Sequence, residues 1–201
     1  ISSGGNNVRG ARRTPALAWV LLACLLVPSA FSGQQEMPDQ KYAQAGLWVD
    51  AGRYAEALIL YEESLKEDGV FDGNKRSRIF NNMGYCHYKL DGLDAAVDNY
   101  RQALEIDPNY AFCLNNLAVV LMNQKKYKEA LPCLEQANRV EKNIKVVFNL
   151  FAVHYYLDQR KEALVFIKEA FRLDEGYTED RLKKKNVSRE DLDRLKKYIR
   201  E

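Results

Sequence analysis

The sequence is poor in the residues from which metal sites and nucleophilic catalytic sites are built. Its 201 residues include only two histidines and four cysteines, and neither an HExxH motif nor a pair of CxxC motifs occurs. A glycine-rich loop that would cradle a phosphate is also missing, as is a nucleophile with a matching base in a recognisable motif. The sequence therefore predicts a protein that is not an enzyme and that holds no metal or cofactor.

The chain also lacks a strong net charge. Three of its 30 basic residues lie in residues 1–32, and the remaining 27 stand against 28 acidic residues. Binding to nucleic acid normally requires a concentrated basic surface that neutralises phosphates. The balance of charge therefore predicts that nucleic acid is not a partner.

Residues 1–32 are predicted to be a signal peptide or a membrane-targeting segment. The cationic stretch RGARRT precedes the apolar stretch PALAWVLLACLLV, and the small residues of PSAFSG follow. Cleavage after Ser32 would place Ala30 and Ser32 in the two small-residue positions that a signal peptidase requires. This order predicts a protein outside the cytoplasm, most simply in a periplasm, with residues 33–37 as a linker.

Two alternatives remain for this segment. The sequence LLAC resembles a bacterial lipobox, which would make Cys24 a lipidated N-terminus, although the apolar run continues through Val27. A retained membrane anchor is the other interpretation, although Pro28 and the short apolar stretch oppose it. Either alternative would associate the protein with a membrane through its N-terminal segment.

An internal repeat occupies most of the remaining chain. The pair Asn81-Asn82 in NNMGY recurs thirty-four residues later as Asn115-Asn116 in NNLAV. Four such units can be aligned, and each predicts a helix, a tight turn and a second helix. The aligned small and aromatic positions include Gly84 with Ala118, Ala96 with Ala130, and Tyr100 with Leu134.

The pattern resembles the tetratricopeptide repeat family, since GRYAEALILYEESL and AAVDNYRQALEIDPNY are close to its second-helix signature. The resemblance covers residues 38–176 and implies an all-α fold. The expected architecture is a right-handed solenoid of about four helix-turn-helix repeats with a C-terminal capping helix. The repeats are expected at residues 38–71, 77–110, 111–143 and 144–176.

Residues 177–201 are expected to form a basic linker and the capping helix. The helix is predicted to begin near Ser188, whose hydroxyl can cap the first amides, with Asp191 completing a capping box. The linker contains Asn186 in a glycosylation sequon, which is meaningful only in a eukaryotic host.

Small residues should lie where the helices of a hairpin cross, because larger side chains would push the two axes apart. Gly84 and Ala96 are predicted to face one another at the crossing in the second repeat. Tyr61 and Tyr100 are expected to fill the space between neighbouring hairpins.

The first helices of stacked repeats line a concave face, so the resemblance implies a groove that binds a peptide or a segment of another protein. Asn82, Asn116 and Asn149 recur along this face, and an amide can both donate and accept a hydrogen bond. The series resembles the asparagine ladder with which some members of the family grip the backbone of an extended peptide. Alternatively, these amides bond a neighbouring helix instead of a ligand.

Aromatic residues and lysines on the same face complete the predicted groove, because they would anchor apolar side chains of a ligand. The basic clamp that holds a terminal carboxylate in chaperone-tail binders has no counterpart at Tyr42 and Gly46. The predicted groove residues are Asn82, Tyr85, Tyr88, Lys89, Asn115, Asn116, Val119, Met122, Asn123, Lys145, Phe148, Asn149, Tyr155 and Tyr156.

Two functions are consistent with these features. The first is a non-catalytic adaptor or scaffold that holds a segment of another protein in the groove. The second is a structural subunit of an envelope or membrane-associated complex, packed through its convex face or its termini. An exposed aromatic groove would favour the first function, and a C-terminal helix folded into the groove would favour the second.

Overall fold

A computed structural model of the protein describes residues 38–66, 71–185 and 187–200. The predicted signal segment with Cys24, the linker 33–37 and the sequon residue Asn186 lie outside the described residues. The described helices belong to one compact unit, Met37–Glu201. Among them, none has both the length and the hydropathy needed to cross a membrane.

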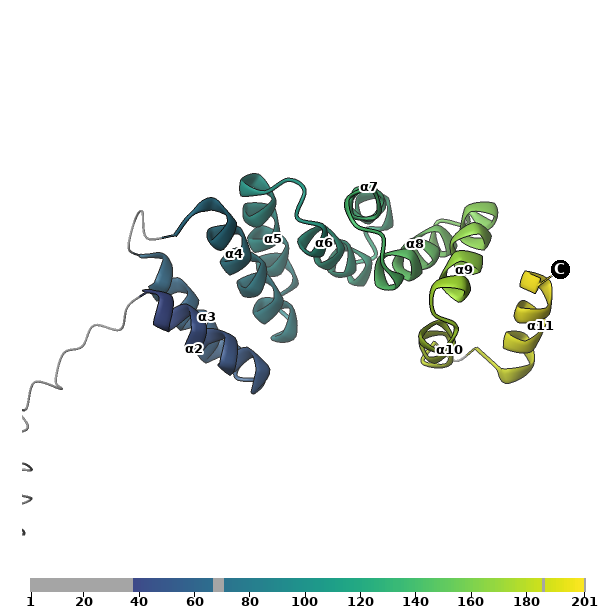
Figure 1. The fold of residues 1–201 in the computed structure, drawn as a ribbon, viewed down its shortest axis with the longest axis horizontal. Coiled ribbons are helices and arrows are strands. Elements are labelled where there is room, and N and C mark those ends of the chain that lie inside the picture. The colour runs from purple at the N-terminus through teal and green to yellow at the C-terminus, as the bar shows by residue number, and fades with distance from the viewer. Residues whose placement is uncertain (1–37, 67–70, 186, 201) are drawn as a thin grey trace, which may run out of the picture. The chain divides into compact units, whose positions relative to one another are not determined.

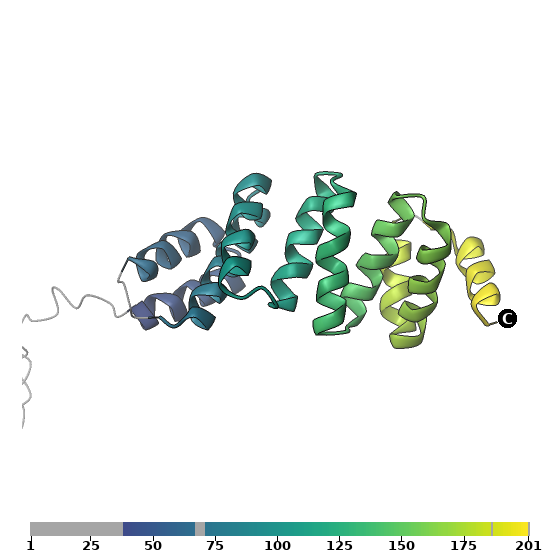
Figure 2. The same ribbon diagram turned by 90° about the horizontal axis from the view of Figure 1, so that it is seen from above.

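The described residues contain helices and no strands, and the helices follow one another as antiparallel pairs (Figure 1). Within each of four pairs, α2/α3, α4/α5, α6/α7 and α8/α9, the two helices pack along their length, and each pair packs on the next. Figure 2 shows the pairs side by side in chain order. The predicted all-α repeat fold is therefore confirmed. The helices are α2 (Pro38–Asp50), α3 (Tyr54–Leu65), α4 (Gly73–Lys89), α5 (Leu93–Ile106), α6 (Ala111–Asn123), α7 (Tyr127–Val140), α8 (Ile144–Tyr156), α9 (Arg160–Leu173), α10 (Glu175–Lys183) and α11 (Arg189–Arg200).

The first helix of each pair ends in the same kind of turn. One residue of each turn has a positive φ: Gly52 (75°), Asp91 (63°), Lys125 (60°) and Asp158 (55°). The next amide then donates back into the helix, as from Gly92 to the carbonyl oxygen of His87 at 2.8 Å. This left-handed C-terminal cap satisfies carbonyl groups that would otherwise lack a partner. The cap residues of the second, third and fourth repeats also define which positions of these repeats are equivalent.

The helix crossing in the second pair is closed by Gly84 and Tyr100. A Cβ atom on Gly84 would lie 2.8 Å from both Cδ1 and Cε1 of Tyr100, whose side chain is buried. The three heavy atoms nearest to that position all belong to Tyr100, and the predicted partner, Ala96, is not among them. The small residue is therefore needed mainly to admit an aromatic ring.

Helix α4 begins at Gly73, earlier than the predicted start of the second repeat at residue 77. Asp72 caps it, because its side chain accepts a hydrogen bond from the amide of Lys75 at 2.8 Å. Phe71, immediately before the cap, is buried in the core of the first repeat. The extra turn of α4 thus lies over that core.

The C-terminal segment differs from its prediction. Residues 177–183 were expected to be a linker, but they belong to helix α10, which Asp174 caps by accepting a hydrogen bond from the amide of Tyr177 at 2.8 Å. The hydroxyl of Ser188 caps α11 as predicted, accepting a hydrogen bond from the amide of Asp191 at 3.1 Å. Leu182 of α10 and Leu192 of α11 are buried with residues of α8 and α9. Both helices therefore extend the core of the fourth repeat.

Candidate functional site

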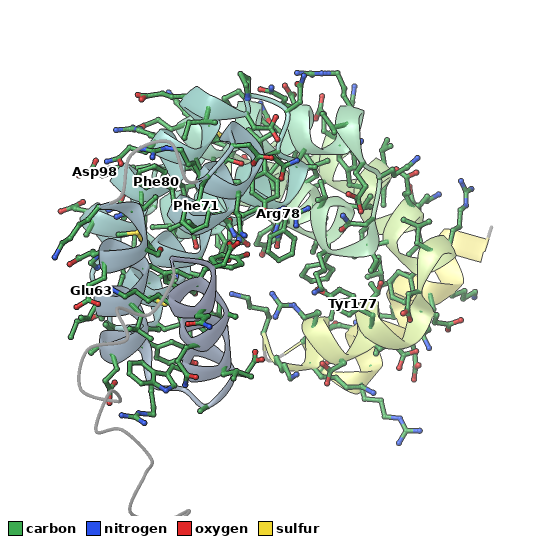
Figure 3. The ribbon with its side chains drawn as sticks, turned by 60° about the vertical axis from the view of Figure 1, so that its left-hand side comes forward. Glu63, Phe71, Arg78, Phe80, Asp98 and Tyr177 are labelled. Carbon is green, nitrogen blue, oxygen red and sulfur yellow. The ribbon has the colours of Figure 1, made fainter. Side chains whose placement is uncertain are left out.

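Helices α4, α6 and α8 can be aligned by their cap residues Asp91, Lys125 and Asp158. In this alignment, equivalent positions of the three helices carry exposed or half-buried side chains on one side. Figure 3 shows Arg78 of α4 and Tyr177 of α10 pointing to the inside of the helical array, whereas Glu63 of α3 and Asp98 of α5 point outwards. We call the recurring surface the inner face, and each of its members is exposed or half-buried. The inner face comprises Arg78, Tyr85, Tyr88, Lys89, Phe112, Val119, Met122, Asn123, Lys145, Ala152, Tyr155 and Tyr156.

The predicted asparagine series lies beside the inner face, but its amides bond to the preceding repeat. Asn116 Nδ2 donates to Asn81 Oδ1 at 3.1 Å, and Asn149 Nδ2 donates to Asn115 Oδ1 at 2.8 Å. Asn82 Nδ2 donates in the same direction, to the hydroxyl of Tyr61 at 3.1 Å. Each asparagine of the predicted ladder thus ties its own repeat to the one before it.

Burial strengthens this interpretation of the ladder. Asn115 is 9% exposed and Asn149 is 8% exposed. Buried polar groups need hydrogen-bond partners, and these two side chains are hydrogen-bonded to each other. Asn115 and Asn149, both predicted as groove residues, are therefore in the interior between repeats. The ladder exists in the predicted positions, and its hydrogen bonds brace the fold.

An aromatic and cationic cluster lies at the first half of the inner face. The rings of Tyr54 and Tyr85 meet edge to face with centroids 6.1 Å apart, and Lys89 Nζ lies 5.6 Å and 6.0 Å from the two centroids. Nearby, the hydroxyl of Tyr88 accepts a hydrogen bond from Asn123 Nδ2 at 3.0 Å. Four of the predicted groove residues, Tyr85, Tyr88, Lys89 and Asn123, are thus brought together on adjacent repeats.

The fourth repeat carries the most exposed aromatic residue of the inner face, Tyr155. Tyr155 is 65% exposed and Tyr156 is 45% exposed. The ring of Tyr156 stacks on that of Tyr127 with centroids 4.7 Å apart, which holds it in place. Val119 and Met122 lie half-buried on α6, while Lys145 is exposed at the start of α8. Apart from Lys145, these residues form the aromatic and apolar second half of the inner face.

A pocket of about 230 Å³ opens beside Tyr155 and Tyr156. It lies between the end of α8 and the segment that links α10 to α11. Small-molecule sites usually enclose roughly 300–1,000 Å³. This pocket is smaller, so its size suits a single apolar side chain. Its lining residues are Phe148, Phe151, Ala152, Tyr155, Tyr156, Leu182, Lys185 and Val187.

Phe148 was predicted to be an exposed anchor, but it is only 2% exposed. Helix α10 covers it: the ring of Tyr177 meets it edge to face at 6.2 Å between centroids, and the Arg181 guanidinium lies 5.6 Å from its centroid. Phe148 therefore forms the floor of the pocket and packs in the core.

The sequence analysis missed Arg78, Phe112 and the residues that α10 contributes. Phe112 and Arg78 occupy the position of Lys145 one and two repeats earlier, and Phe112 is 57% exposed. The repeat interval was the signal that would have found both. Leu182, Lys185 and Val187 carry no such signal, because they lie outside the repeats.

Cys86, Cys113 and His154 are buried in the fold. Burial raises the pKa of the Cys86 thiol to about 11 and that of Cys113 to about 12, so both stay protonated near neutral pH. His154 is buried, with Nδ1 2.6 Å from Gln159 Oε1 and its ring stacked on Phe166. No group of three or more metal-ligating side chains occurs in the part of the chain that the structure describes.

Comparison with known proteins identifies the type of repeat. Two family models described as tetratricopeptide repeat match the chain, one over residues 45–109 and the other over residues 99–131. The fold is a solenoid of tetratricopeptide repeats. Among solved structures, MamA matches 71% of this chain and 81% of its own with a TM-score of 0.62 and 17% identity. YrrB, described as a TPR protein with an unusual peptide-binding site, matches 73% of this chain and 74% of its own with a TM-score of 0.61 and 20% identity. At these identities the likeness shows the fold alone.

The curated relatives match a shorter stretch of tetratricopeptide sequence. The photosystem I assembly protein Ycf3 of Prochlorococcus marinus (strain MIT 9313) is 35% identical over 92 residues, which are 45% of this chain and 51% of that protein. The uncharacterized protein ycf37 of Pyropia yezoensis is 31% identical over 97 residues, 46% of this chain and 54% of that protein. The chain thus spans about half the length of the curated relatives it matches.

Proposed function

We propose that the protein is a non-catalytic adaptor that holds a segment of another protein on the inner face. The observation that carries this proposal is the exposure of Tyr155 and Tyr156 beside a pocket sized for one apolar side chain. Aromatic residues that line pockets dominate the binding energy of many protein interfaces. Tyr156 also loses little conformational entropy on binding, because it is already stacked on Tyr127.

The comparisons give this proposal its class of activity. Ycf3, which matches part of this chain in sequence, is described as an assembly protein, and YrrB, which shares its fold, as a protein with a peptide-binding site. An assembly or scaffolding role is the corresponding proposal here. We place it outside the cytoplasm, because a cationic stretch, an apolar stretch and small residues stand in the order of an export signal in residues 1–32.

A second candidate is a structural subunit whose C-terminal helices occupy its own groove. Helix α10 favours this candidate in the fourth repeat, since Tyr177 and Arg181 cover Phe148. The coverage stops short of Tyr155 and Tyr156, which remain exposed. The adaptor function therefore uses Tyr155 and Tyr156, which α10 leaves exposed.

Selection of binding peptides tests the adaptor function. A displayed library of random peptides is panned on the full chain, and enriched peptides are titrated against the Tyr155→Ala variant. Tyr198→Ala is the matched control, because Tyr198 is 53% exposed on α11, away from the inner face. We expect Tyr155→Ala to weaken binding about tenfold or more, as for an interface anchor, and Tyr198→Ala to leave it unchanged. Equal binding by both variants would exclude the inner face as the working surface.

A further inference from the structure

The inner helices of the second, third and fourth repeats contain no acidic residue. Helices α4, α6 and α8, each described in full, carry neither Asp nor Glu, whereas α3, α5, α7 and α9 each carry several. The inner row of these repeats is therefore basic, whereas in the outer row α3 and α5 are acidic, α7 is balanced and α9 is basic. The cationic residues of the inner row are Lys75, Arg76, Arg78, Lys89 and Lys145.

Several carboxylates beside this row are paired within the fold, whereas Asp91 lines the same hollow as Lys89 and Asn123. Asp39 of α2 pairs with Lys75. On α10, Glu179 pairs with Lys183 and Lys196, and Asp180 pairs with Lys184 at 2.7 Å. These pairs reduce the negative potential that Asp39, Glu179 and Asp180 contribute to the inner face.

The cations of the inner face stay available to a ligand. Among the ion pairs of the described residues, none involves Arg78, Lys89, Lys145 or Lys185, and Lys89 is held only by the rings of Tyr54 and Tyr85. Lys185 lies at the rim of the pocket whose other lining residues are apolar or aromatic. Positive charge on the second and fourth repeats thus flanks the uncharged, mainly apolar side chains of the third repeat.

We infer that the segment held on the inner face is acidic, with carboxylate side chains between bulky apolar ones. Charge complementarity of this kind speeds encounter and excludes partners of the wrong sign. One apolar side chain enters the pocket over Phe148, and a neighbouring carboxylate meets Lys185. The inference rests on the proposed function and names the chemistry of its partner. Because no terminal carboxylate is required, an internal segment of a protein serves as well as its end.

A protein segment fits these observations better than an anionic lipid surface. The pocket of about 230 Å³ is lined from three sides, by α8, α10 and Val187, and admits one protruding side chain. Arg78 and Lys145 occupy equivalent positions two repeats apart and Lys185 adjoins the fourth repeat, so an extended chain that runs across successive repeats would meet them in turn. A lipid surface would instead require the cations and aromatic residues on one protruding surface.

Three amidated peptides of one length test the inference against the full chain by fluorescence anisotropy. In the first, Glu alternates with Phe or Leu; in the second, Gln replaces every Glu; in the third, Lys replaces it. We expect the Glu peptide to bind about tenfold or more tightly than the Gln peptide at low salt, and the advantage to shrink as ionic strength rises. The Lys peptide should bind most weakly.

Charge reversal locates the effect on the protein. Lys145→Glu and Lys185→Glu should each weaken binding of the Glu peptide about threefold to tenfold and leave the Gln peptide unchanged. Lys128→Glu, on the exposed side of the outer helix α7, is the matched control and should change neither. An equal effect of all three reversals would overturn the inference, because it would reflect net charge alone.

Two further results separate the inference from the function on which it rests. If the displayed library yields neutral or basic peptides whose binding depends on Tyr155, the inference is wrong and the adaptor function stands. If no peptide depends on Tyr155, the adaptor function fails as well. Vesicles of phosphatidylglycerol and of phosphatidylcholine complete the test. Binding to the former that depends on Lys145, without binding of the Glu peptide, would overturn the inference in favour of a lipid surface.

Discussion

Asn149 donates a hydrogen bond from Nδ2 to Oδ1 of Asn115 at 2.8 Å, and the bond joins two repeats in the interior of the protein. Replacing Asn149 by Ala would leave the buried Asn115 carbonyl without its partner. We expect Asn149→Ala to lower the free energy of unfolding by about 1–3 kcal/mol, measured by urea denaturation.

The double variant Asn115→Ala/Asn149→Ala should cost less than the sum of the two single variants, because it removes both polar groups. Asn123→Ala is the control on the exposed side of α6 and should change stability by less than about 0.5 kcal/mol. Additive single variants would show that the two amides are not coupled.

The contact between Gly84 and Tyr100 predicts opposite outcomes for the same substitution at two sites. Gly84→Ala should lower the free energy of unfolding by about 1–3 kcal/mol, because the new methyl group would overlap the ring of Tyr100. Gly46→Ala in α2 meets nothing within 4 Å and should raise it by up to about 1 kcal/mol through helix propensity. Thermal unfolding of the two variants compares them, and a shift of the same sign in both would contradict the described crossing.

The turn at Lys125 predicts a stabilising substitution. Lys125 has a φ of 60°, a conformation that costs a residue with a Cβ atom about 1–2 kcal/mol. Lys125→Gly removes this cost and adds an entropic one of about 0.5–1 kcal/mol, so we expect a net gain of about 0.5–1 kcal/mol. As a comparison, Glu135→Gly in the middle of α7 should lower the free energy of unfolding by about 1 kcal/mol. Chemical denaturation of both variants measures the pair, and a loss in Lys125→Gly would contradict the assigned turn.

The buried thiols predict how stability changes in alkali. Burial raises the pKa of Cys86 from 9.0 to about 11 and that of Cys113 from 9.0 to about 12. Between pH 9 and pH 11 the unfolded chain therefore loses these protons while the folded chain keeps them, and stability falls as pH rises. We expect each thiol to contribute about 1–2 kcal/mol to this fall.

The comparison for this prediction is the double variant Cys86→Ala/Cys113→Ala, whose free energy of unfolding is measured at several pH values. Its absolute stability will differ from that of the unsubstituted chain, so only the slope against pH is compared. The slope should be shallower in the double variant. Parallel slopes would mean that the thiols ionise equally in the folded and unfolded chains.

The sequence was sufficient to predict the helices and their pairing, because the repeat interval places small and aromatic residues where the packing needs them. It was also sufficient to predict which asparagines form a series. Whether those amides face a ligand or a neighbouring helix could not be decided, since Asn116 offers the same donor and acceptor in either case. That decision required the position of Asn81 on the preceding repeat.

The pocket was beyond sequence reasoning for a different reason. Residues 175–183 are mostly polar and carry no repeat signature, so α10 was taken in part for a linker. Its Tyr177 and Leu182 pack with residues of α8, α9 and α11, a packing that the sequence pattern of the repeats does not show. Without α10, Phe148 was interpreted as an exposed anchor. The same missing helix explains why Lys185 was not recognised.

The origin of Leu182, Lys185 and Val187 outside the repeats limits how this protein can be rebuilt. Repeats can be shuffled or multiplied in a solenoid, because each contacts only its neighbours. Rearranged repeats would keep the asparagine hydrogen bonds between repeats, since every repeat from the second to the fourth supplies its own donor. The pocket would not be carried by a transferred repeat, because three of its lining residues follow the last repeat. A lengthened array would keep a single pocket, at whichever repeat the C-terminal helices adjoin.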